Sequence, residues 1–342
     1  MNRKNLLKGN DFFGNLKNSG ILVLVVIGVV LILSGNVSAA NCGGAVQCGC
    51  GDTLTSSLTM TGDLSNCPGN GIIFEADNIV LDCQGHTIEG DGSGYLFDYG
   101  IYLNSRQNNT IKNCIIRNFY HGIYLYSSSN NFLTNNTANS NRYGIFLNSS
   151  SNNSLTNNTA NLNNVTGIYI FGNSNFNKIL NNKILNNGKT GITLSNCGFW
   201  GHCYDNAGNS NNKIKDNKIL NNNVGIFSHQ SNSTINNNVV CRNANLDFNS
   251  SAWQSSSGDN NTCNNSDGWN DTSVTGCKIS CNCINFDFDN DNKVDIFDVV
   301  AGLEHLKEEK MIYNKWCSAR NYNEIDLFDL LILIEKIGMN TV

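Results

Sequence analysis

The chain has 342 residues and a formal net charge of −5, with 14 cysteines and a single proline. This acidic balance, without a cluster of lysine and arginine, argues against nucleic acid or an anionic membrane surface as a partner. Asparagine accounts for 65 residues, about one in five, and composition alone would suggest disorder. The regular spacing of the apolar residues argues instead for a folded chain of repeats.

Residues 1–40 are predicted to be an export signal. Four basic residues and one acidic residue precede an uninterrupted apolar run at 21–33. Thirteen helical residues rise roughly 20 Å, which is short of the ~30 Å hydrocarbon core of a membrane. We therefore expect cleavage after the small residues at 38–40, with an uncleaved anchor as the alternative. Removal of this segment takes away four positive charges and one negative charge, so the mature chain carries about −8.

All 14 cysteines follow the predicted cleavage site, and an even number in an exported chain predicts disulfides in an oxidising compartment. A secreted, extracellular or cell-surface location is therefore expected. Residues 41–70 hold four of the cysteines and are predicted to be a disulfide-rich cap over an open sheet edge. Cys83 and Cys114 occupy matching places in consecutive repeats, so a disulfide between neighbouring coils is predicted for this pair.

A repeat of about 22 residues occupies residues 71–243. A glycine–isoleucine phrase, in most copies followed by an aromatic residue, recurs at Gly100, Gly122, Gly144, Gly167, Gly191 and Gly225. A second apolar position recurs in step at Ile111, Leu133, Leu155, Ile179, Ile214 and Ile235. A third is assigned to Ile115, Thr137, Thr159, Ile184, Ile219 and Val239. Each period therefore predicts three short strands.

Strands this short cannot bury an apolar face alone, so the periods are expected to stack on one another. The predicted fold is an all-β, right-handed parallel β-helix, in which neighbouring coils bond at ~4.8 Å and apolar side chains stack inward. Asparagine suits the tight corners because it tolerates the left-handed conformation, and its amide can bond to the equivalent amide one coil away. Glycine before isoleucine is expected to give another corner the same conformational freedom.

Residues 196–210 interrupt the sixth coil and predict a loop that projects from the solenoid, closed by Cys197 and Cys203. Loops on solenoids often carry the binding function. The candidate ligand-binding residues are Trp200, His202, Tyr204 and Asp205 in this loop, together with Tyr102, Tyr124 and Tyr169 in the repeat. The alternative is a stiffened loop whose aromatic side chains cover the solenoid.

Residues 244–283 are predicted to be a cysteine-rich cap or linker, and residues 284–342 a separate calcium-binding module. The predicted metal ligands are Asp287, Asp289, Asp291, the backbone carbonyl of Lys293, Asp295 and Asp298. These residues match the ligand positions of a calcium loop, and hard oxygen ligands at this spacing predict one bound Ca²⁺.

Aspartate as the last ligand, followed at once by an amphipathic helix, resembles the dockerin family. The phrase IDLFDLL at 325–331 repeats VDIFDVV at 294–300, as a duplicated dockerin half would. The resemblance implies docking on a cohesin-type protein partner. The second copy has Ser318, Arg320 and Tyr322 at the first ligand positions, so a calcium-stabilised terminal domain without cohesin binding is the alternative.

The phrases NIVLDCQGHTIEG at 78–90, GIYL, and NNSLTNNT at 152–159 resemble the right-handed β-helix superfamily of carbohydrate-binding proteins and sugar hydrolases. Within it, they resemble sequences related to NosD, a copper-site maturation protein. The resemblance implies a polysaccharide or glycan as partner. The favoured hypothesis is therefore a carbohydrate-binding or adhesion protein, tethered through the dockerin-like module. The alternatives are a polysaccharide hydrolase or lyase, and a NosD-like periplasmic copper-site maturation protein.

No catalytic residue is assigned. Polysaccharide hydrolysis needs two carboxylates placed together, whereas those of the repeat are scattered at Asp82, Glu89, Asp91, Asp98, Asp216 and Asp247. A copper site would need histidine, methionine or cysteine gathered in one place, and the five histidines are far apart in the sequence.

Overall fold

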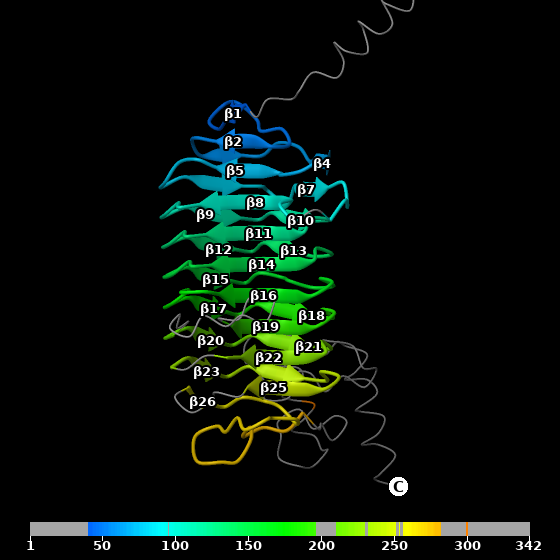
Figure 1. The fold of residues 1–342 in the computed structure, drawn as a ribbon, viewed down its shortest axis with the longest axis vertical. Coiled ribbons are helices and arrows are strands. Elements are labelled where there is room, and N and C mark those ends of the chain that lie inside the picture. The colour runs from blue at the N-terminus through cyan, green and yellow to red at the C-terminus, as the bar shows by residue number, and fades with distance from the viewer. Residues whose placement is uncertain are drawn as a thin grey trace, which may run out of the picture. The chain divides into compact units, whose positions relative to one another are not determined.

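The computed structural model describes residues 40–94, 96–195, 210–229, 232–250 and 256–281, together with Trp253 and Val299. The chain winds through stacked coils whose strands form three faces (Figure 1). Every pairing between named strands is parallel, and each strand pairs with its counterpart in the next coil. The predicted all-β parallel β-helix is confirmed.

The three faces are built as follows. Sheet A has ten strands, β1 Asn41–Cys42, β2 Asp52–Leu54, β5 Ile72–Phe74, β8 Tyr99–Asn104, β11 His121–Tyr126, β14 Tyr143–Asn148, β16 Thr166–Phe171, β19 Thr190–Ser195, β22 Val224–Ser228 and β25 Leu246–Ser250. Sheet B has nine, β3 Leu58–Thr59, β6 Val80–Asp82, β9 Thr110–Lys112, β12 Phe132–Thr134, β15 Ser154–Thr156, β17 Lys178–Leu180, β20 Lys213–Lys215, β23 Thr234–Asn236 and β26 Ser257–Asp259. Face C joins two smaller sheets, β4 Leu64–Cys67, β7 Thr87–Gly90, β10 Ile115–Arg117 and β13 Thr137–Ala138, then β18 Lys183–Leu185, β21 Lys218–Leu220 and β24 Val239–Cys241.

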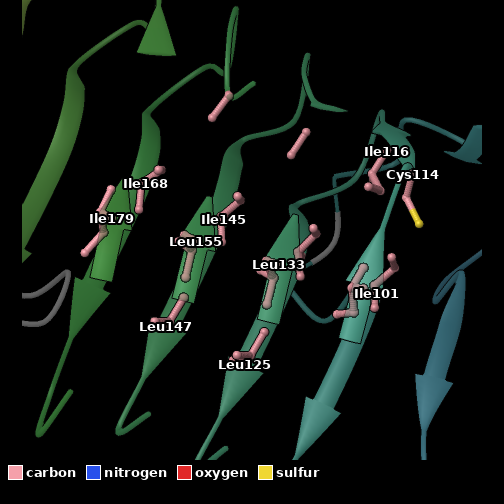
Figure 2. Close-up of a cluster of buried hydrophobic side chains, with 14 of the residues drawn as sticks. Ile101, Cys114, Ile116, Leu125, Leu133, Ile145, Leu147, Leu155, Ile168 and Ile179 are labelled. Carbon is pink, nitrogen blue, oxygen red and sulfur yellow. The ribbon is translucent and has the colours of Figure 1, made fainter. Parts of the chain in front are cut away.

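Rows of similar apolar side chains from successive coils form the interior (Figure 2). On sheet A, Ile123 pairs with Ile145, which pairs with Ile168, and all three are 0% exposed. On sheet B, Leu133 pairs with Leu155 in the same way, and both are completely buried. The first and second apolar positions predicted from the repeat therefore point into a shared core.

The prediction of the third apolar position is wrong in four coils. The buried side chains on face C are Ile116, Ala138, Ala160 and Val240, each one residue beyond the predicted Ile115, Thr137, Thr159 and Val239. Ile184 and Ile219 are buried as predicted. Because side chains alternate between the two faces of a strand, an error of one residue exchanges core and solvent. The core residue is alanine at 138 and 160, and the prediction chose the larger threonine that precedes each alanine.

The corners use asparagine and glycine for different physical reasons. Asn135, Asn157 and Asn181 adopt the left-handed conformation predicted for corner asparagines, with φ of 56°, 57° and 55°. Gly122, in contrast, does not have a left-handed φ, which corrects the reason expected for the glycine of the repeat. A Cβ atom at Gly122 would lie 2.6 Å from the carbonyl oxygen of Gly144 in the next coil. Glycine is required there because neighbouring coils approach too closely for a side chain.

A second set of asparagines points inward and forms hydrogen-bonded ladders between coils. The side-chain nitrogen of Asn158 donates to Oδ1 of Asn182 at 3.1 Å and to the carbonyl of Leu133 at 2.9 Å. Oδ1 of Asn158 accepts from the backbone and side-chain nitrogens of Asn136, each at 3.0 Å. The three ladders are Asn109–Asn131–Asn153–Asn177–Asn212, Asn136–Asn158–Asn182–Asn217–Asn238–Asn261 and Asn141–Asn163–Asn187–Asn222–Asn243. These ladders satisfy polar groups that the corners would otherwise bury without partners.

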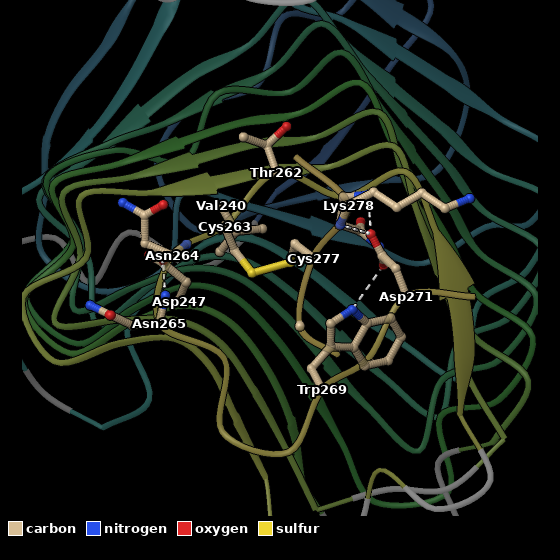
Figure 3. The surroundings of a disulfide bond; sticks show 12 residues. Val240, Asp247, Thr262, Cys263, Asn264, Asn265, Trp269, Asp271, Cys277 and Lys278 are labelled. Atoms are coloured by element: carbon tan, nitrogen blue, oxygen red, sulfur yellow. Dashed lines mark hydrogen bonds between the residues drawn. A yellow bond between two sulfur atoms is a disulfide. The ribbon is translucent and has the colours of Figure 1, made fainter. Parts of the chain in front are cut away.

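Aspartates end two of the ladders. The side chain of Asn261 donates to Asp271 at 2.7 Å, and that of Asn243 donates to Asp247 at 2.9 Å. Asp271 also accepts a hydrogen bond of 3.0 Å from the indole nitrogen of Trp269, which lies beside the Cys263–Cys277 disulfide (Figure 3). A carboxylate suits this end of the solenoid because it only accepts hydrogen bonds and needs no further coil.

The disulfides connect neighbouring parts of the solenoid. The predicted bond between Cys83 and Cys114 is present, with a Cα–Cα distance of 4.7 Å. The remaining pairs among the described residues are Cys42–Cys48, Cys50–Cys67, Cys241–Cys281 and Cys263–Cys277. All ten cysteines in this part of the chain are therefore oxidised, which fits an extracellular or periplasmic location.

Regular pairing extends beyond residues 71–243 at both ends. Strands β2, β3 and β4 already pair with β5, β6 and β7, so the segment 41–70 holds a coil as well as its two disulfides. At the other end, β25 and β26 continue sheets A and B. The ring of Trp269 then stacks on Phe248, with centroids 5.3 Å apart, and covers this end of the core.

Several predicted segments lie outside the described residues. These are the export segment at 1–39, the loop at 196–209 and the calcium-binding module, of which only Val299 is described. Within the described ranges, no helix has the length and apolar character needed to cross a membrane.

Candidate ligand-binding face

A row of aromatic side chains follows the outer face of sheet A. Tyr102, Tyr124, Phe146 and Tyr169 pair in register on β8, β11, β14 and β16. Successive ring centroids are 5.6, 5.2 and 4.7 Å apart. The residues on either side of each ring point into the core, so the rings face outward. The structure thus brings the three predicted tyrosines into one row and adds Phe146, which stands at the same place in its repeat.

A second row lies beside the first, at the start of the same strands. It consists of Tyr99, His121 and Tyr143, all of which are buried. The His121 ring stacks on Tyr124 with centroids 4.8 Å apart, and Tyr99 stacks on Tyr102 at 4.6 Å. These residues were missed because only the phrase starting with glycine was considered, although an aromatic residue or histidine precedes that glycine in three consecutive coils.

The two rows together form what we call the aromatic face, and its outer side is open to solvent. Tyr102, Tyr124 and Tyr169 are partly exposed, and Tyr126 beside them is 41% exposed. Tyr126 contacts Tyr124 with a centroid distance of 6.4 Å, and Phe171 contacts Tyr169 at 5.9 Å. The face therefore presents partly exposed rings at Tyr102, Tyr124 and Tyr169 above a floor of buried rings, whereas Phe146 in the outer row is only 6% exposed.

The aromatic face stays uncharged over a wide pH range. Burial is the main cause that lowers the pKa of His121 to about 3, and the positive charge of Arg142 contributes to the same shift. Burial also raises the pKa of Tyr124 and Tyr169 above the ordinary tyrosine value. The imidazole is therefore neutral and the phenols keep their protons, so the face offers neutral hydroxyl groups and ring surfaces.

Hydroxyl and amide groups border the rings. The side-chain nitrogen of Asn148 donates to the Tyr124 hydroxyl at 3.0 Å. On β16 and β19 threonines stand beside the row, and the Thr190 hydroxyl lies 2.8 Å from that of Thr166 and 2.6 Å from that of Thr193, although Thr166 and Thr193 are buried. The place of the rings is thus taken by Thr193 on β19 and is aromatic again at Phe227 on β22.

The described carboxylates serve structural roles, as far as their contacts show. Asp82 accepts hydrogen bonds at a corner from Gln84 and Asn113 and lies 3.1 Å from the ammonium of Lys112. No group of three or more histidine, cysteine, aspartate or glutamate side chains is gathered within the described ranges. Catalytic residues are therefore not assigned.

The described residues also do not fit a copper site. Soft metals are held by thiolates, thioethers and imidazoles, but the ten described cysteines are all in disulfides. His86 lies 3.0 Å from the carboxylate of Asp63, and His121 is enclosed by aromatic rings. The candidate residues Trp200, His202, Tyr204 and Asp205 lie outside the described residues, and so do the predicted calcium ligands from Asp287 to Asp298.

The fold and this face define the class of the protein, a disulfide-bonded parallel β-helix with an aromatic outer face. A family model described as periplasmic copper-binding protein (NosD) matches residues 51–207, which supports the NosD-like character of that part of the solenoid. No curated protein matches the chain.

Solved β-helix structures resemble the chain weakly. The periplasmic alginate epimerase AlgG is 18% identical with a TM-score of 0.46, and the alignment covers 55% of this chain and 46% of the epimerase. The A-module of mannuronan C-5 epimerase AlgE4 from Azotobacter vinelandii is 14% identical, with a TM-score of 0.40 and coverage of 66% and 77%. Endo-xylogalacturonan hydrolase from Aspergillus tubingensis is 13% identical, with a TM-score of 0.43 and coverage of 72% and 82%. The chain thus spans about half the length of AlgG, and similarity this low carries no inference about ligand or reaction.

Proposed function

We propose that this protein is an exported carbohydrate-binding protein that holds a polysaccharide along the aromatic face. The observation that carries the proposal is the row formed by Tyr102, Tyr124, Phe146 and Tyr169. Sugar rings have apolar C–H groups that pack against aromatic rings, whose faces are electron-rich and whose edges are electron-poor. Contiguous exposed aromatic surface on a soluble protein commonly marks a binding site. Neutral tyrosine and threonine hydroxyls beside it supply partners for sugar hydroxyls.

The linear arrangement favours an extended chain over a small molecule. The rings recur once per coil, at the ~4.8 Å step between parallel strands. A polymer lying along the solenoid axis would therefore meet partly exposed side chains at Tyr102, Tyr124, Tyr169 and Thr190, whereas Phe146 and Thr193 in the same row are buried. The repeated contacts add up along one ligand, so each can be weak. This is the geometry of a binding or adhesion surface.

The test compares the mature chain, residues 41–342, with a Tyr102→Ala/Tyr124→Ala variant on a glycan array. We expect at least about tenfold weaker binding of the variant, because two exposed ring contacts of ~1 kcal/mol or more are removed. Phe132→Ala is the matched control, since Phe132 is 53% exposed on sheet B rather than sheet A. Equal binding by wild type and the tyrosine variant would refute the proposal. Release of oligosaccharides over time would favour the hydrolase or lyase alternative.

The C-terminal module is proposed to bind one Ca²⁺ and to tether the solenoid to a protein partner of the cohesin type. The support is the spacing of the oxygen ligands from Asp287 to Asp298 in the sequence. Calorimetry of the full mature chain should show one tight site that is lost in Asp287→Ala. Asp326→Ala, in the degenerate second copy, is the control and should keep that site. Two equal sites, or none, would contradict the proposal.

A further inference from the structure

Two basic residues lie along one edge of the aromatic face. Arg142 directly precedes β14, and Lys189 directly precedes β19. Backbone hydrogen bonds hold them in register, since Val165 N–H donates to the Arg142 carbonyl at 2.9 Å and Lys189 N–H donates to the Val165 carbonyl at 2.8 Å. The two basic residues therefore stand two coils apart on the same edge, and both are exposed.

These residues differ from the basic residues of the earlier coils. There, Arg106 pairs with Glu75, and Arg117 lies 3.0 Å from Glu89. Neither Arg142 nor Lys189 forms an ion pair with a carboxylate in the part of the chain that the structure describes.

Arg142 lies over the ring of Tyr120, which borders the aromatic face and contacts His121 and Tyr143 with centroids 4.8 and 5.8 Å apart. Its guanidinium carbon lies 5.1 Å from the centroid of the Tyr120 ring, within the range of a cation–π contact. Its charge also acts on His121 and Tyr143 in the floor of the face. A planar guanidinium held in this way can donate two parallel hydrogen bonds to a carboxylate or sulfate.

One acidic residue shares this edge. Asp98 precedes β8, and its carbonyl accepts from the backbone N–H of His121 at 3.1 Å, so it stands two coils from Arg142 on the side away from Lys189. The Ser93 hydroxyl donates to its carboxylate at 2.8 Å. The edge is therefore acidic beside Tyr99 and basic from Arg142 to Lys189.

We infer that the polysaccharide bound by the aromatic face is anionic, and that Arg142 and Lys189 bind acid groups on sugars two coils apart. The coil step of ~4.8 Å separates the two cations by roughly 10 Å along the ligand. The acid groups are carboxylates or sulfates, which share charge and hydrogen-bonding geometry. The inference rests on the proposed function and adds the ligand class and the residues that select it.

The experiment uses matched polymers that differ in charge. Polygalacturonate is compared with its methyl ester, and dextran sulfate with dextran, by affinity electrophoresis of the mature protein. Wild type should bind at least one acidic polymer more tightly than its neutral counterpart, and Arg142→Gln/Lys189→Gln should bind that polymer about tenfold more weakly. The preferred acidic polymer tells carboxylate from sulfate. The loss should shrink at high salt, because exposed charges are screened.

The control variant removes the same charge elsewhere. Lys178→Gln/Lys213→Gln changes two exposed lysines that pair on sheet B, and it should bind like wild type. Equal binding of the acidic and neutral polymers, or wild-type binding by the Arg142/Lys189 variant, would overturn the inference. The Tyr102→Ala/Tyr124→Ala variant separates the two ideas. If it weakens binding while the Arg142/Lys189 variant does not, the proposed function stands and the anionic preference is wrong.

Discussion

Replacement of Asn158 by aspartate tests the asparagine ladder with almost no change in side-chain shape. The amide nitrogen of Asn158 donates to the Leu133 carbonyl and to Oδ1 of Asn182, and the side chain is about 1% exposed. In the variant, a carboxylate oxygen would face those two acceptors. Both hydrogen bonds would be lost, and a negative charge would be buried with the two donors of Asn136 but without a cation beside it.

The expected loss is large. The Leu133 carbonyl would lose the amide donor of Asn158 at a cost of about 1–3 kcal/mol before the charge is considered. Oδ1 of Asn182 would keep the backbone N–H of Asn158, but it would face a second oxygen in place of the amide nitrogen. Burial should also raise the pKa of the new aspartate in the folded state above its unfolded value of ~3.9. The neutral acid is then favoured by folding, so the variant should be closest to wild type at low pH and lose stability as the pH rises through the folded pKa.

The assay is urea unfolding of the mature chain, followed by far-UV circular dichroism at pH 7 and pH 4. The neighbouring Asn157→Asp is the control, because Asn157 is exposed at a left-handed corner that aspartate also tolerates. The control should stay within about 0.5 kcal/mol of wild type. An Asn158→Asp protein as stable as the control at pH 7 would refute the view that the ladder stabilises the coils.

Two further predictions concern the aromatic face and the contact between coils. Burial lowers the pKa of His121 from 6.5 to about 3, so protonation favours the unfolded chain and wild-type stability should fall as the pH drops below 6.5. In His121→Phe, this loss of folding stability should be smaller by up to ~1.4 kcal/mol per pH unit. If the unfolding curves of wild type and variant shift in parallel with pH, the lowered pKa of His121 is wrong. Gly122→Ala should destabilise by about 1–3 kcal/mol, because the new methyl group would meet the Gly144 carbonyl at 2.6 Å. Gly62→Ala, which meets nothing within 4 Å, should be neutral in the same thermal melts, and equal losses would show that packing is not the cause.

The stacking of the coils could be predicted because it depends on local, periodic features of the sequence. The inward residues Ile123, Ile145 and Leu133 recur at fixed intervals, and a shared interior is the simplest way to bury them. The Cys83–Cys114 disulfide followed from the same periodicity. These predictions needed only the repeat length and the geometry of parallel strands.

The register on face C could not be predicted equally well. Its strands contain only two to four residues, and the core position is alanine at 138 and 160, which carries a weak apolar signal. The asparagine pairs were similarly ambiguous. In the sequence the two residues are alike, but Asn157 takes the corner and Asn158 takes the ladder, a division fixed by which side chain faces the interior.

The candidate site was predicted in part. Tyr102, Tyr124 and Tyr169 share one place in the repeat, so their alignment followed once the strands stacked. The floor of the face was missed, because the burial of His121 depends on rings from neighbouring coils. The edge formed by Arg142 and Lys189 could not be inferred from spacing alone. Only the stacked coils show that neither residue has an acidic partner among the described residues.

Hydroxyl-radical footprinting of the mature protein, with and without a polysaccharide that it binds, tests most directly whether the ligand lies on the aromatic face. We predict that the polysaccharide protects Tyr124 and Tyr126 on sheet A from the radical and leaves the reactivity of Phe132 and Phe176 unchanged. Protection at Phe132 and Phe176 while Tyr124 and Tyr126 keep their reactivity would show that the ligand binds another face, and the central claim would be wrong.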